Sequence, residues 1–399
     1  MLLELVLALT IGIFAGIITG LTPGIHVNLV SAFLLASLSF FSAISPITLV
    51  IFIVAMSITH TFLDFIPSIF LGAPDEDTSL AVLPGHKLLL KGKGYEALIL
   101  TLYGGVLGVI LILILVPAFI FILPKIYFYL KFVMFFLLLF TSLYLLIREK
   151  SLASLIIFLL AGFLGTATLN ISLKESLLPL LTGLFGSSSL LTSIIKKEKL
   201  PKQKLIKLRD IKIKKSSVIK TIFTGLLVTP LCSFLPSLGS NQAAMIGTDL
   251  IEITKKEFLI LIGAINTAIA GLSFIALFSI SEARTGTAVA VEKLLTSFSG
   301  ANLLIIIATI ILSSILAFFL TILFAKFFSK NIPRVNYKYM SIAILIFLAI
   351  IVLIFSGFLG FLVFIVSTFL GLSAIFLKVR RTNLMASLMI PSILLYFPF

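Results

Sequence analysis

The fold class is decided by residues 5–63, which read LVLALTIGIFAGIITGLTPGIHVNLVSAFLLASLSFFSAISPITLVIFIVAMSITHTFL and contain no Asp, Glu, Lys or Arg. A second charge-free run, of 39 residues, extends from Tyr339 to Leu377. A membrane-spanning helix needs about 20 apolar residues, so each run is long enough to cross the bilayer and turn back. We therefore predict an all-α polytopic integral membrane protein.

Composition supports this class and excludes others. Of the 399 residues, 60% are hydrophobic and only 11% are charged, against about 25% charged residues in an ordinary soluble domain. Soluble enzymes and disordered tails are thereby excluded. The single cysteine, Cys232, excludes an internal disulfide and a metal site built from cysteines. Because Met1-Leu-Leu-Glu4 carries no basic residue, we expect the first apolar helix to be retained as a span rather than cleaved.

The net charge of +15 is concentrated in a few places. Eleven of the 30 Lys and Arg residues lie between Lys196 and Lys220, and most others flank apolar runs. This distribution is typical of cytoplasmic loops that set topology, not of a groove that binds nucleic acid. We predict an N-terminal membrane repeat at residues 1–195, a basic cytoplasmic linker at 196–216 and a C-terminal membrane repeat at 217–399.

The lengths of the charge-free stretches and the positions of Gly and Pro divide the chain into roughly 14 apolar segments. Some of these are too short to cross the membrane fully. With the linker in the cytoplasm, counting spans places every other basic cluster in the cytoplasm and the N-terminus outside the cell membrane. The halves then have opposite orientations, which predicts two inverted-topology repeats, a construction common in secondary transporters. Residues 77–82 and 286–291 align weakly and occupy equivalent places in the two halves.

Each half carries a polar interruption with Pro and Asn five residues apart. The pairs are Pro23 with Asn28 and Pro236 with Asn241, and Gly24 follows the first Pro where Ser237 follows the second. Pro and Gly break helical hydrogen bonding, and freed backbone groups inside a membrane need protein or a water-filled cavity. We expect broken or re-entrant helices whose N-termini face an anion. Ordinary turns outside the membrane are the alternative.

An ionisable pair lies within the third predicted span, residues 46–71. His60 and Asp64 are four residues apart, so they share one face of a helix. Ionisable groups inside a span are costly and are functional candidates by default. If this span ends earlier, the pair is merely interfacial.

Other acidic residues are candidates for cation or proton coupling. Glu76 and Asp77 lie in the most acidic stretch of the chain, residues 73–78, which can equally be a solvated loop with a helix cap. Asp249 lies in the short segment 240–253 together with Glu252, and both can equally be surface acids.

The second half adds Asn266 inside an apolar span and Arg284 at its end. The guanidinium fork of arginine suits a carboxylate or phosphate. Arg284 is also the only arginine that the predicted topology places outside the cytoplasmic clusters. Pairing with Glu282, or anchoring of a helix end, is the alternative role.

Recognised motifs for metal binding or catalysis are absent from the sequence. The three histidines, His26, His60 and His86, have spacings that match no local zinc motif. There is no Gly-x-Ser-x-Gly, His-Glu-x-x-His or phosphate-loop motif. We therefore expect no cofactor beyond a sodium ion or proton used for coupling. An intramembrane enzyme remains an alternative only through His60 and Asp64.

Several motifs resemble one transporter family. Residues 68–76, Ser-Ile-Phe-Leu-Gly-Ala-Pro-Asp-Glu, resemble the Ser-Ile-Leu-Leu-Asn-x-Pro-Gly-Glu signature of the tripartite tricarboxylate transporter large permease. Gly16-x-x-x-Gly20-x-x-Pro23-Gly24 is similar to that family's first Pro-Gly motif. Glu257 and Ile265-Asn266-Thr-Ala268 resemble its Glu and Asn-Asn-Ala segment. The resemblance covers residues 12–110 well and 217–295 loosely.

This resemblance implies inverted repeats, cation-driven uptake, carboxylate substrates, a small membrane subunit and an extracytoplasmic binding protein. The chain is about a hundred residues shorter than a typical member and looks like a short archaeal relative. It departs from the pattern at Asp75, which replaces a Gly, at Ser237 in the second Pro-Gly motif, and at His26, which takes a small-residue position.

Three functional hypotheses follow, the first being a permease for a small di- or tricarboxylate-like anion. In that hypothesis the candidate substrate-binding residues are Pro23, Gly24, His26, Asn28, Pro236, Ser237, Asn241, Asn266 and Arg284. The candidate coupling residues are His60, Asp64, Glu76 and Asp249. The second hypothesis is a translocase for a lipid-linked phosphate, since clustered Lys and Arg suit phosphate head groups. The third is an intramembrane enzyme that uses His60 and Asp64. Membrane lipids are partners in each case.

Overall fold

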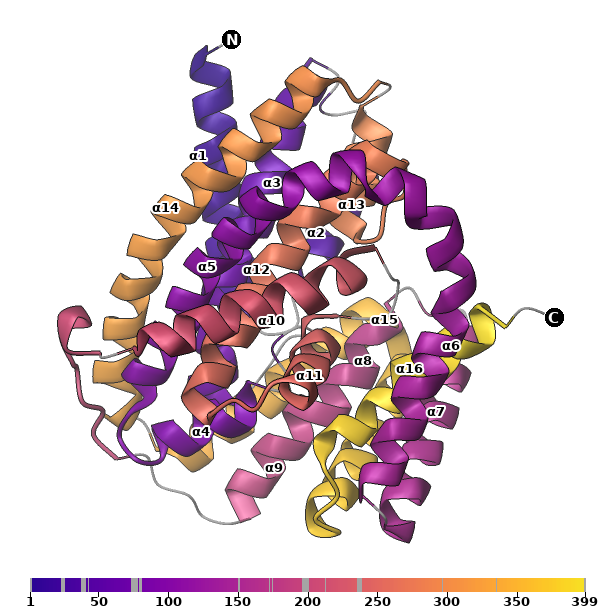
Figure 1. Cartoon of the computed structure of the whole chain (residues 1–399). Coiled ribbons are helices and arrows are strands. Elements are labelled where there is room, and N and C mark those ends of the chain that lie inside the picture. Colours follow the sequence, from indigo (N-terminus) through magenta and orange to yellow (C-terminus); the bar gives the residue numbers. More distant parts are fainter. Residues whose placement is uncertain are drawn as a thin grey trace.

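The computed structural model describes residues 2–22, 26–36, 41, 43–72, 78, 81–149, 151–171, 173, 175–195, 201–211, 213–234, 239–295, 297–334 and 336–397. Within these ranges every regular element is a helix, and no β-strand occurs (Figure 1). The predicted all-α class is confirmed.

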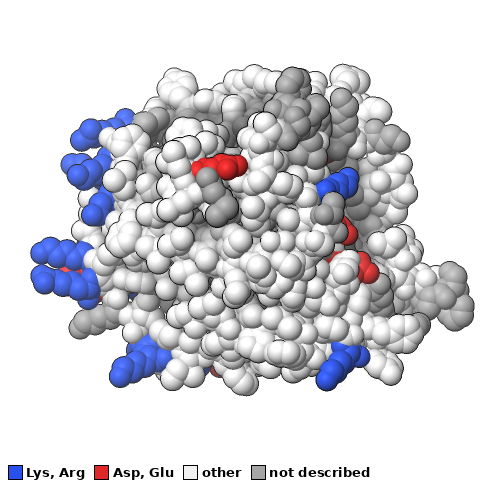
Figure 2. Space-filling model, turned by 90° about the horizontal axis from the view of Figure 1, so that it is seen from above, with Lys and Arg blue, Asp and Glu red and all other residues white. Residues whose placement is uncertain are grey.

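Seven helices of the described chain are long and apolar enough to cross a membrane. They are α1 (Leu2–Leu21), α3 with the following π-helical turn η2 (Pro46–Leu71), α5 (Gly94–Phe121), α7 (Leu152–Asn170), α12 (Lys255–Ile280), α14 (Gly300–Asn331) and α15 (Tyr337–Phe376). Large apolar side chains such as Phe163 and Phe319 are exposed on them. Figure 2 shows a face with few charged side chains, on which most Lys and Arg lie along the left and lower edges and a few Asp and Glu lie within the face. These features are those of a multi-pass membrane protein.

The sequence predicts that the second charge-free run is divided at Gly357 into two apolar segments, 339–356 and 358–377, and helix α15 covers nearly all of both. At about 1.5 Å per residue, its 40 residues would reach about 60 Å if straight, twice the thickness of the hydrocarbon layer. The helix is interrupted at Gly357, whose backbone has φ 69° and ψ −169°. Only glycine adopts these angles without strain, so the boundary between the two predicted segments falls on this residue.

Three predicted segments are short helices in the structure, namely α2 (Val27–Ala36), α11 (Ser240–Leu250) and α16 (Ala386–Leu395). Two further short helices, α4 (Val82–Leu89) and α13 (Gly286–Leu294), lie between predicted segments. Helices of 8 to 11 residues are about 12–17 Å long, roughly half of the hydrocarbon thickness. At the two predicted interruptions, α1 ends at Leu21 and α2 begins at Val27, while α10 (Lys215–Phe234) ends before α11 begins at Ser240. The helices are thus broken at both places, and their re-entrant character stays a prediction.

Helices α3 and α12 form the centre of the molecule, and both are almost wholly buried. Helix α5 packs along α12 with its backbone in direct contact, because Gly104 and Gly108 face Ile260 and Ala264 of α12. Gly12, Gly16 and Gly20 allow α1 an equally close approach to α3. Together with α2, α4, α10 (Lys215–Phe234), α11, α13 and α14, these helices form what we term the first packing group.

A second packing group occupies the lower right of Figure 1. It contains α7, α8 (Leu177–Leu181), the π-helical segment η4 (Thr182–Ser187), α9 (Ser188–Ile195), α15 and α16. Helix α6 (Leu123–Glu149) connects the two groups along the chain. The basic region between α9 and α10 falls at the predicted linker, while the division into 1–195, 196–216 and 217–399 stays a prediction.

Arg381 lies buried inside the second group, although it belongs to the basic cluster Lys378, Arg380 and Arg381, which the span count predicts to face the cytoplasm. Its guanidinium donates to the carbonyl oxygens of Leu184 and Phe185 and to the hydroxyls of Ser188 and Ser189. Burial lowers the pKa of Arg381 to about 10, so the side chain keeps its charge near neutral pH. This arginine joins the end of the first half to the end of the second.

Candidate functional site

One face of α3 carries the polar residues of the candidate site. Ser57, His60, Thr61 and Asp64 follow the spacing i, i+3, i+4, i+7, which places them on a single helix face. All four are buried. The α-helix ends at Leu63, and the backbone N–H of Asp64 still donates to the carbonyl of His60. The predicted pair therefore lies in a buried part of its helix rather than at an exposed end.

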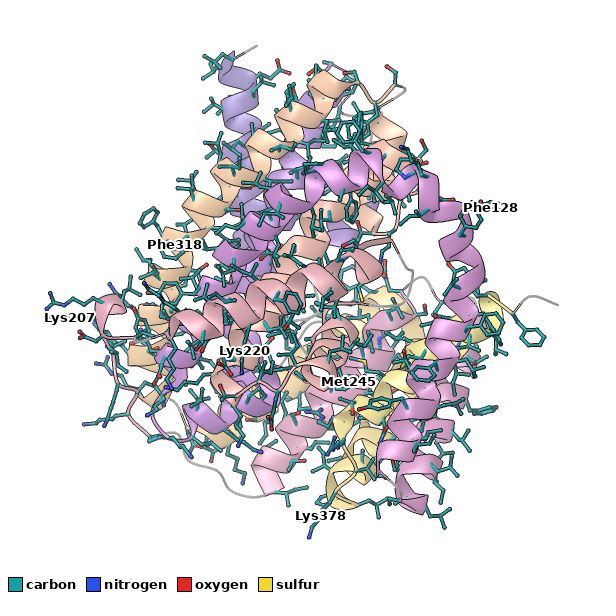
Figure 3. All side chains as sticks on the ribbon, in the orientation of Figure 1. Phe128, Lys207, Lys220, Met245, Phe318 and Lys378 are labelled. Atoms are coloured by element: carbon teal, nitrogen blue, oxygen red, sulfur yellow. The ribbon has the colours of Figure 1, made fainter. Side chains whose placement is uncertain are left out.

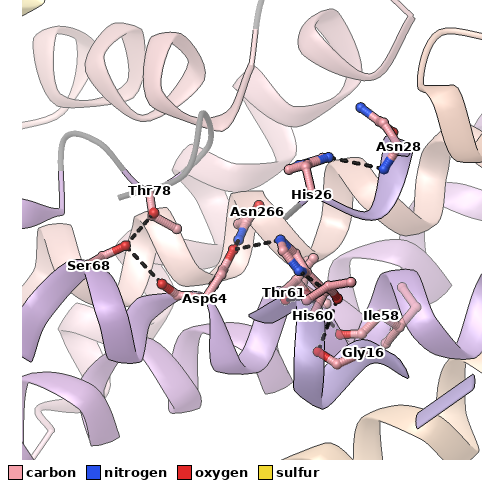
Figure 4. A network of polar contacts seen from close by, with 12 residues as sticks. Gly16, His26, Asn28, Ile58, His60, Thr61, Asp64, Ser68, Thr78 and Asn266 are labelled. Carbon is pink, nitrogen blue, oxygen red and sulfur yellow. Dashed lines mark hydrogen bonds and ion pairs between the residues drawn. The ribbon is translucent and has the colours of Figure 1, made fainter. Parts of the chain in front are cut away.

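Asp64 is held by a distant residue, Asn266, through its carboxylate and by a near neighbour, Ser68, through its backbone (Figure 4). Its Oδ2 atom accepts a hydrogen bond of 2.8 Å from Nδ2 of Asn266 on α12. Its backbone carbonyl accepts a bond of 2.8 Å from Ser68, whose hydroxyl also contacts that of Thr78 at 2.5 Å. Asp64 and Asn266 are only 1% and 3% exposed. The carboxylate is thus fixed between the two central helices, α3 and α12.

The hydrogen bonds around His60 indicate which ring nitrogen carries the proton. His60 Nδ1 lies 3.1 Å from the hydroxyl oxygen of Thr19, and that hydroxyl donates to the carbonyl of Gly16. A hydroxyl has only one hydrogen, so a Thr19 that donates to Gly16 is arranged to accept from a proton on His60 Nδ1. The other nitrogen, Nε2, lies 4.0 Å from Asp64 Oδ2. The ring of His26 packs edge-on against that of His60, with centroids 5.1 Å apart.

The first turns of α2 and α13 meet beside this pair. The backbone N–H of Asn28 donates to His26 Nδ1 at 3.2 Å. Thr285 caps α13 by accepting from the backbone N–H of Ala288 at 3.1 Å. The two helices approach closely at Gly286, where a Cβ atom would lie 2.9 Å from that of Asn28. Two helix N-termini, each with orphan backbone N–H groups, are therefore directed to one place.

A cavity of about 270 Å³ lies between these elements. Its polar wall consists of His26, Asn28, Ser57, His60, Thr61, Asp64, Asn266, Arg284, Thr285 and Thr287. Three leucines from the second packing group, Leu169, Leu177 and Leu388, form part of its apolar wall. The side-chain oxygen of Asn28 is buried and has no hydrogen-bond partner within the described chain.

Six of the residues selected from the sequence line this cavity, namely His26, Asn28, His60, Asp64, Asn266 and Arg284. Asn241 is buried at the start of α11, and its near neighbour Gly239 contributes to the lining. Asp249 lies on α11, with its side chain outside the described part of the structure. Pro23, Gly24, Glu76, Pro236 and Ser237 also lie outside the described residues. Their roles stay predictions.

Sequence reasoning missed several lining residues. Ser57 and Thr61 could have been found by extending the helical spacing of His60 and Asp64 along the same face. Thr285 could have been found as a residue that precedes a short helix and favours its N-cap. The three leucines gave no signal, because they are apolar residues in an apolar chain.

Among the described residues, no three His, Cys, Asp or Glu side chains are grouped to hold a metal ion. The polar groups that line the cavity are instead an arginine side chain, hydroxyl groups, amide groups and two helix N-termini. Groups of these kinds together suit the binding of an anion. The adjacent carboxylate and imidazole suit the uptake and release of a proton.

Comparison with known proteins gives one family match and one similar protein. The sequence matches the tripartite tricarboxylate transporter TctA family over residues 6–386. An uncharacterized protein of the archaeon Methanocaldococcus jannaschii is 31% identical over 402 aligned residues, covering 98% of this chain and 98% of the relative. No solved structure matches the chain. The family predicted from the motifs at residues 16–24 and 68–76 is thus confirmed over nearly the whole length: this chain belongs to the tripartite tricarboxylate transporter TctA family.

Proposed function

We propose that this permease carries a small anionic solute through the central cavity and couples its movement to protons. The supporting observation is the convergence of Arg284 and the first turns of α2 and α13 on a cavity that also contains His60 and Asp64. The proposal names a carboxylate as the solute class, in line with the tricarboxylate transporter family. The family consists of transporters, which fits a chain that is not an enzyme.

The anion would bind between Arg284 and the two helix N-termini. A guanidinium matches the two oxygens of a carboxylate, and hydrogen bonds to charged groups contribute about 1.5–3 kcal/mol each. The partial positive charge at a helix N-terminus adds to this attraction. Asn28 can turn its amide toward the solute, because its side-chain oxygen has no other partner in the described chain.

The surroundings of His60 support the choice of a proton as the coupling ion. With a proton on Nδ1, a neutral His60 would carry none on Nε2, the nitrogen that lies 4.0 Å from Asp64 Oδ2. A proton taken up by either group would strengthen the attraction between the imidazole and the carboxyl group. The groups that surround the pair are His26, Arg284 and the amide of Asn266. Sodium is the other coupling ion expected from the sequence. The Asp64 experiment described in the Discussion distinguishes coupling to sodium from coupling to protons.

The two halves would be inverted repeats, and their reciprocal packing supports this relation. Helix α3 of the first half packs against α14 of the second, while α12 of the second packs against α5 of the first. In the same way η4 packs against α15, and α16 packs against α7. A two-fold relation between halves produces such exchanged pairs. The N-terminus would lie outside the cell membrane and the linker in the cytoplasm.

The partners of such a permease would be a small membrane subunit and an extracytoplasmic binding protein. This proposal rests on the tripartite organisation that gives the family its name. It predicts that solute delivered by the binding protein enters the cavity from the outer face.

The R284Q variant tests the anion site directly. We expect its half-saturating concentration for carboxylate in a proteoliposome counterflow assay to rise at least about tenfold, because one charged hydrogen-bond partner is worth about 1.5–3 kcal/mol. The measurement compares labelled mono-, di- and tricarboxylates. R334Q removes an exposed arginine that does not line the cavity and is the matched control.

Two results would count against this function. Equal half-saturating concentrations in R284Q and R334Q would remove Arg284 from the solute site. Movement of a polyprenyl phosphate by the wild-type protein, with no carboxylate counterflow, would instead favour the lipid-linked phosphate translocase.

A further inference from the structure

The linker between the halves is held against the turn that joins α4 and α5. Gln203 donates to the carbonyl of Leu89 at 3.0 Å and accepts from the backbone N–H of Gly94 at 2.8 Å. The backbone N–H of Lys204 donates to the carbonyl of Gly92 at 2.8 Å. Tyr103 also donates to the carbonyl of Leu208 at 3.4 Å. Residues 203–208 are therefore fixed in place by bonds to the first half.

This attachment brings three cations around one cavity. Lys207 and Arg209 of the linker and Lys326 near the end of α14 line a cavity of about 590 Å³, together with Tyr95 and Leu205. Lys207 extends from the linker at the left edge of Figure 3, beside α14. Asp210 lies 3.8 Å from Arg209, but no described carboxylate forms an ion pair with Lys207 or Lys326. Like charges held together in this way repel one another unless an anion lies between them.

An apolar strip leads from this cavity along α14. Leu316, Phe319, Leu323 and Lys326 follow helical spacing, so they share one face. Phe319 and Leu323 are 64% and 62% exposed, and Leu205 of the linker is exposed as well. Lysine at the end of a membrane helix normally extends its charge to the interface with water. Charge and apolar surface are thus arranged as in a phospholipid, with the head at Lys326 and the chains along Phe319.

We propose that Lys207, Arg209 and Lys326 form a binding site for the phosphate head group of an anionic membrane lipid, whose acyl chains lie on α14. Basic clusters at the cytoplasmic surface attract anionic lipids by about 1 kcal/mol per residue, or about fivefold in affinity. The site lies apart from the central cavity, since the two share no lining residue. The lipid would join the linker to α14, and so one half of the chain to the other.

Native mass spectrometry of the full chain in neutral detergent tests this site. The protein is titrated with phosphatidylglycerol, phosphatidylcholine, glycerol phosphate and inorganic phosphate. We expect the wild-type protein to bind phosphatidylglycerol in preference to phosphatidylcholine. Removing all three charges, as K207Q/R209Q/K326Q, should weaken phosphatidylglycerol binding on the order of 100-fold. Phosphatidylcholine binding should be unchanged.

The matched control is K91Q/K338Q/K378Q, which removes three cations that do not line this cavity. Equal loss of phosphatidylglycerol binding in both triple variants would overturn the proposal, because total charge rather than this site would then decide affinity. Inorganic phosphate that competes as well as the lipid would overturn the acyl-chain contact. If the triple variant does not fold, the single K326Q variant, at an exposed side chain, should weaken binding about fivefold; unchanged binding there would also contradict the site.

Discussion

The D64N variant is expected to exchange solute across the membrane but to lose the ability to accumulate it. One pH unit is worth 1.36 kcal/mol per proton, so a gradient of about two units supports about 100-fold accumulation through one coupled proton. Asparagine keeps the oxygen that accepts from Asn266 but cannot take up a proton. The accumulation ratio in proteoliposomes with an imposed pH gradient should therefore fall from about 100 to about one.

Counterflow without a gradient provides the internal control, since it requires binding and movement but no coupling. D210N removes an exposed aspartate of the linker and should accumulate solute as the wild type does. Accumulation by D64N at the wild-type ratio would falsify proton transfer through Asp64. Accumulation driven only by a sodium gradient in the wild type would assign the coupling to sodium instead.

The G104A variant is expected to lose much of its stability. A Cβ atom at Gly104 would overlap the carbonyl oxygen of Ile260, and one at Gly108 would lie 2.5 Å from that of Ala264. Because α5 and α12 contact each other along their backbones, a methyl group at Gly104 must push the helices apart. Overpacking of this kind costs about 1–3 kcal/mol or more. The apparent Tm in detergent should fall by several degrees, as measured by scanning fluorimetry.

G300A is the matched control for this substitution. Gly300 begins α14, and a Cβ atom there would meet no atom within 4 Å. Replacing a glycine in helical conformation by alanine is expected to stabilise slightly, by about 0.4–1 kcal/mol. An equal Tm for G104A and G300A would show that the α5–α12 contact relaxes without cost.

Much of the polar wall of the cavity could be predicted from the sequence, because polar residues are scarce in this chain. A histidine and an aspartate four residues apart in one apolar span, at the end of a charge-free run, are expected to face protein or water, and both His60 and Asp64 are buried within the protein. The same reasoning selected Asn266 and Arg284. In a membrane protein each buried polar group needs a partner, so isolated polar residues from separate helices tend to meet.

The partnership between these residues could not be predicted. Asn266 bonds Asp64 across 202 positions of sequence, and that pairing depends on how far α12 is shifted along α3. Small side chains and glycines at helix contacts set this shift, and their effect appears only when the helices are packed. The apolar wall escaped prediction for another reason: Leu169, Leu177 and Leu388 resemble every other leucine that faces lipid or core.

The division of the cavity wall between the two packing groups has a consequence for movement. Every polar lining residue belongs to the first group, whereas Leu169, Leu177 and Leu388 of the second group supply only methyl surface. Leucine contacts have no hydrogen-bond donor or acceptor that must be matched. A displacement of one group against the other would therefore break no hydrogen bond at these three residues. An anion that is bound only by polar residues of the first group would keep its hydrogen bonds during such a displacement.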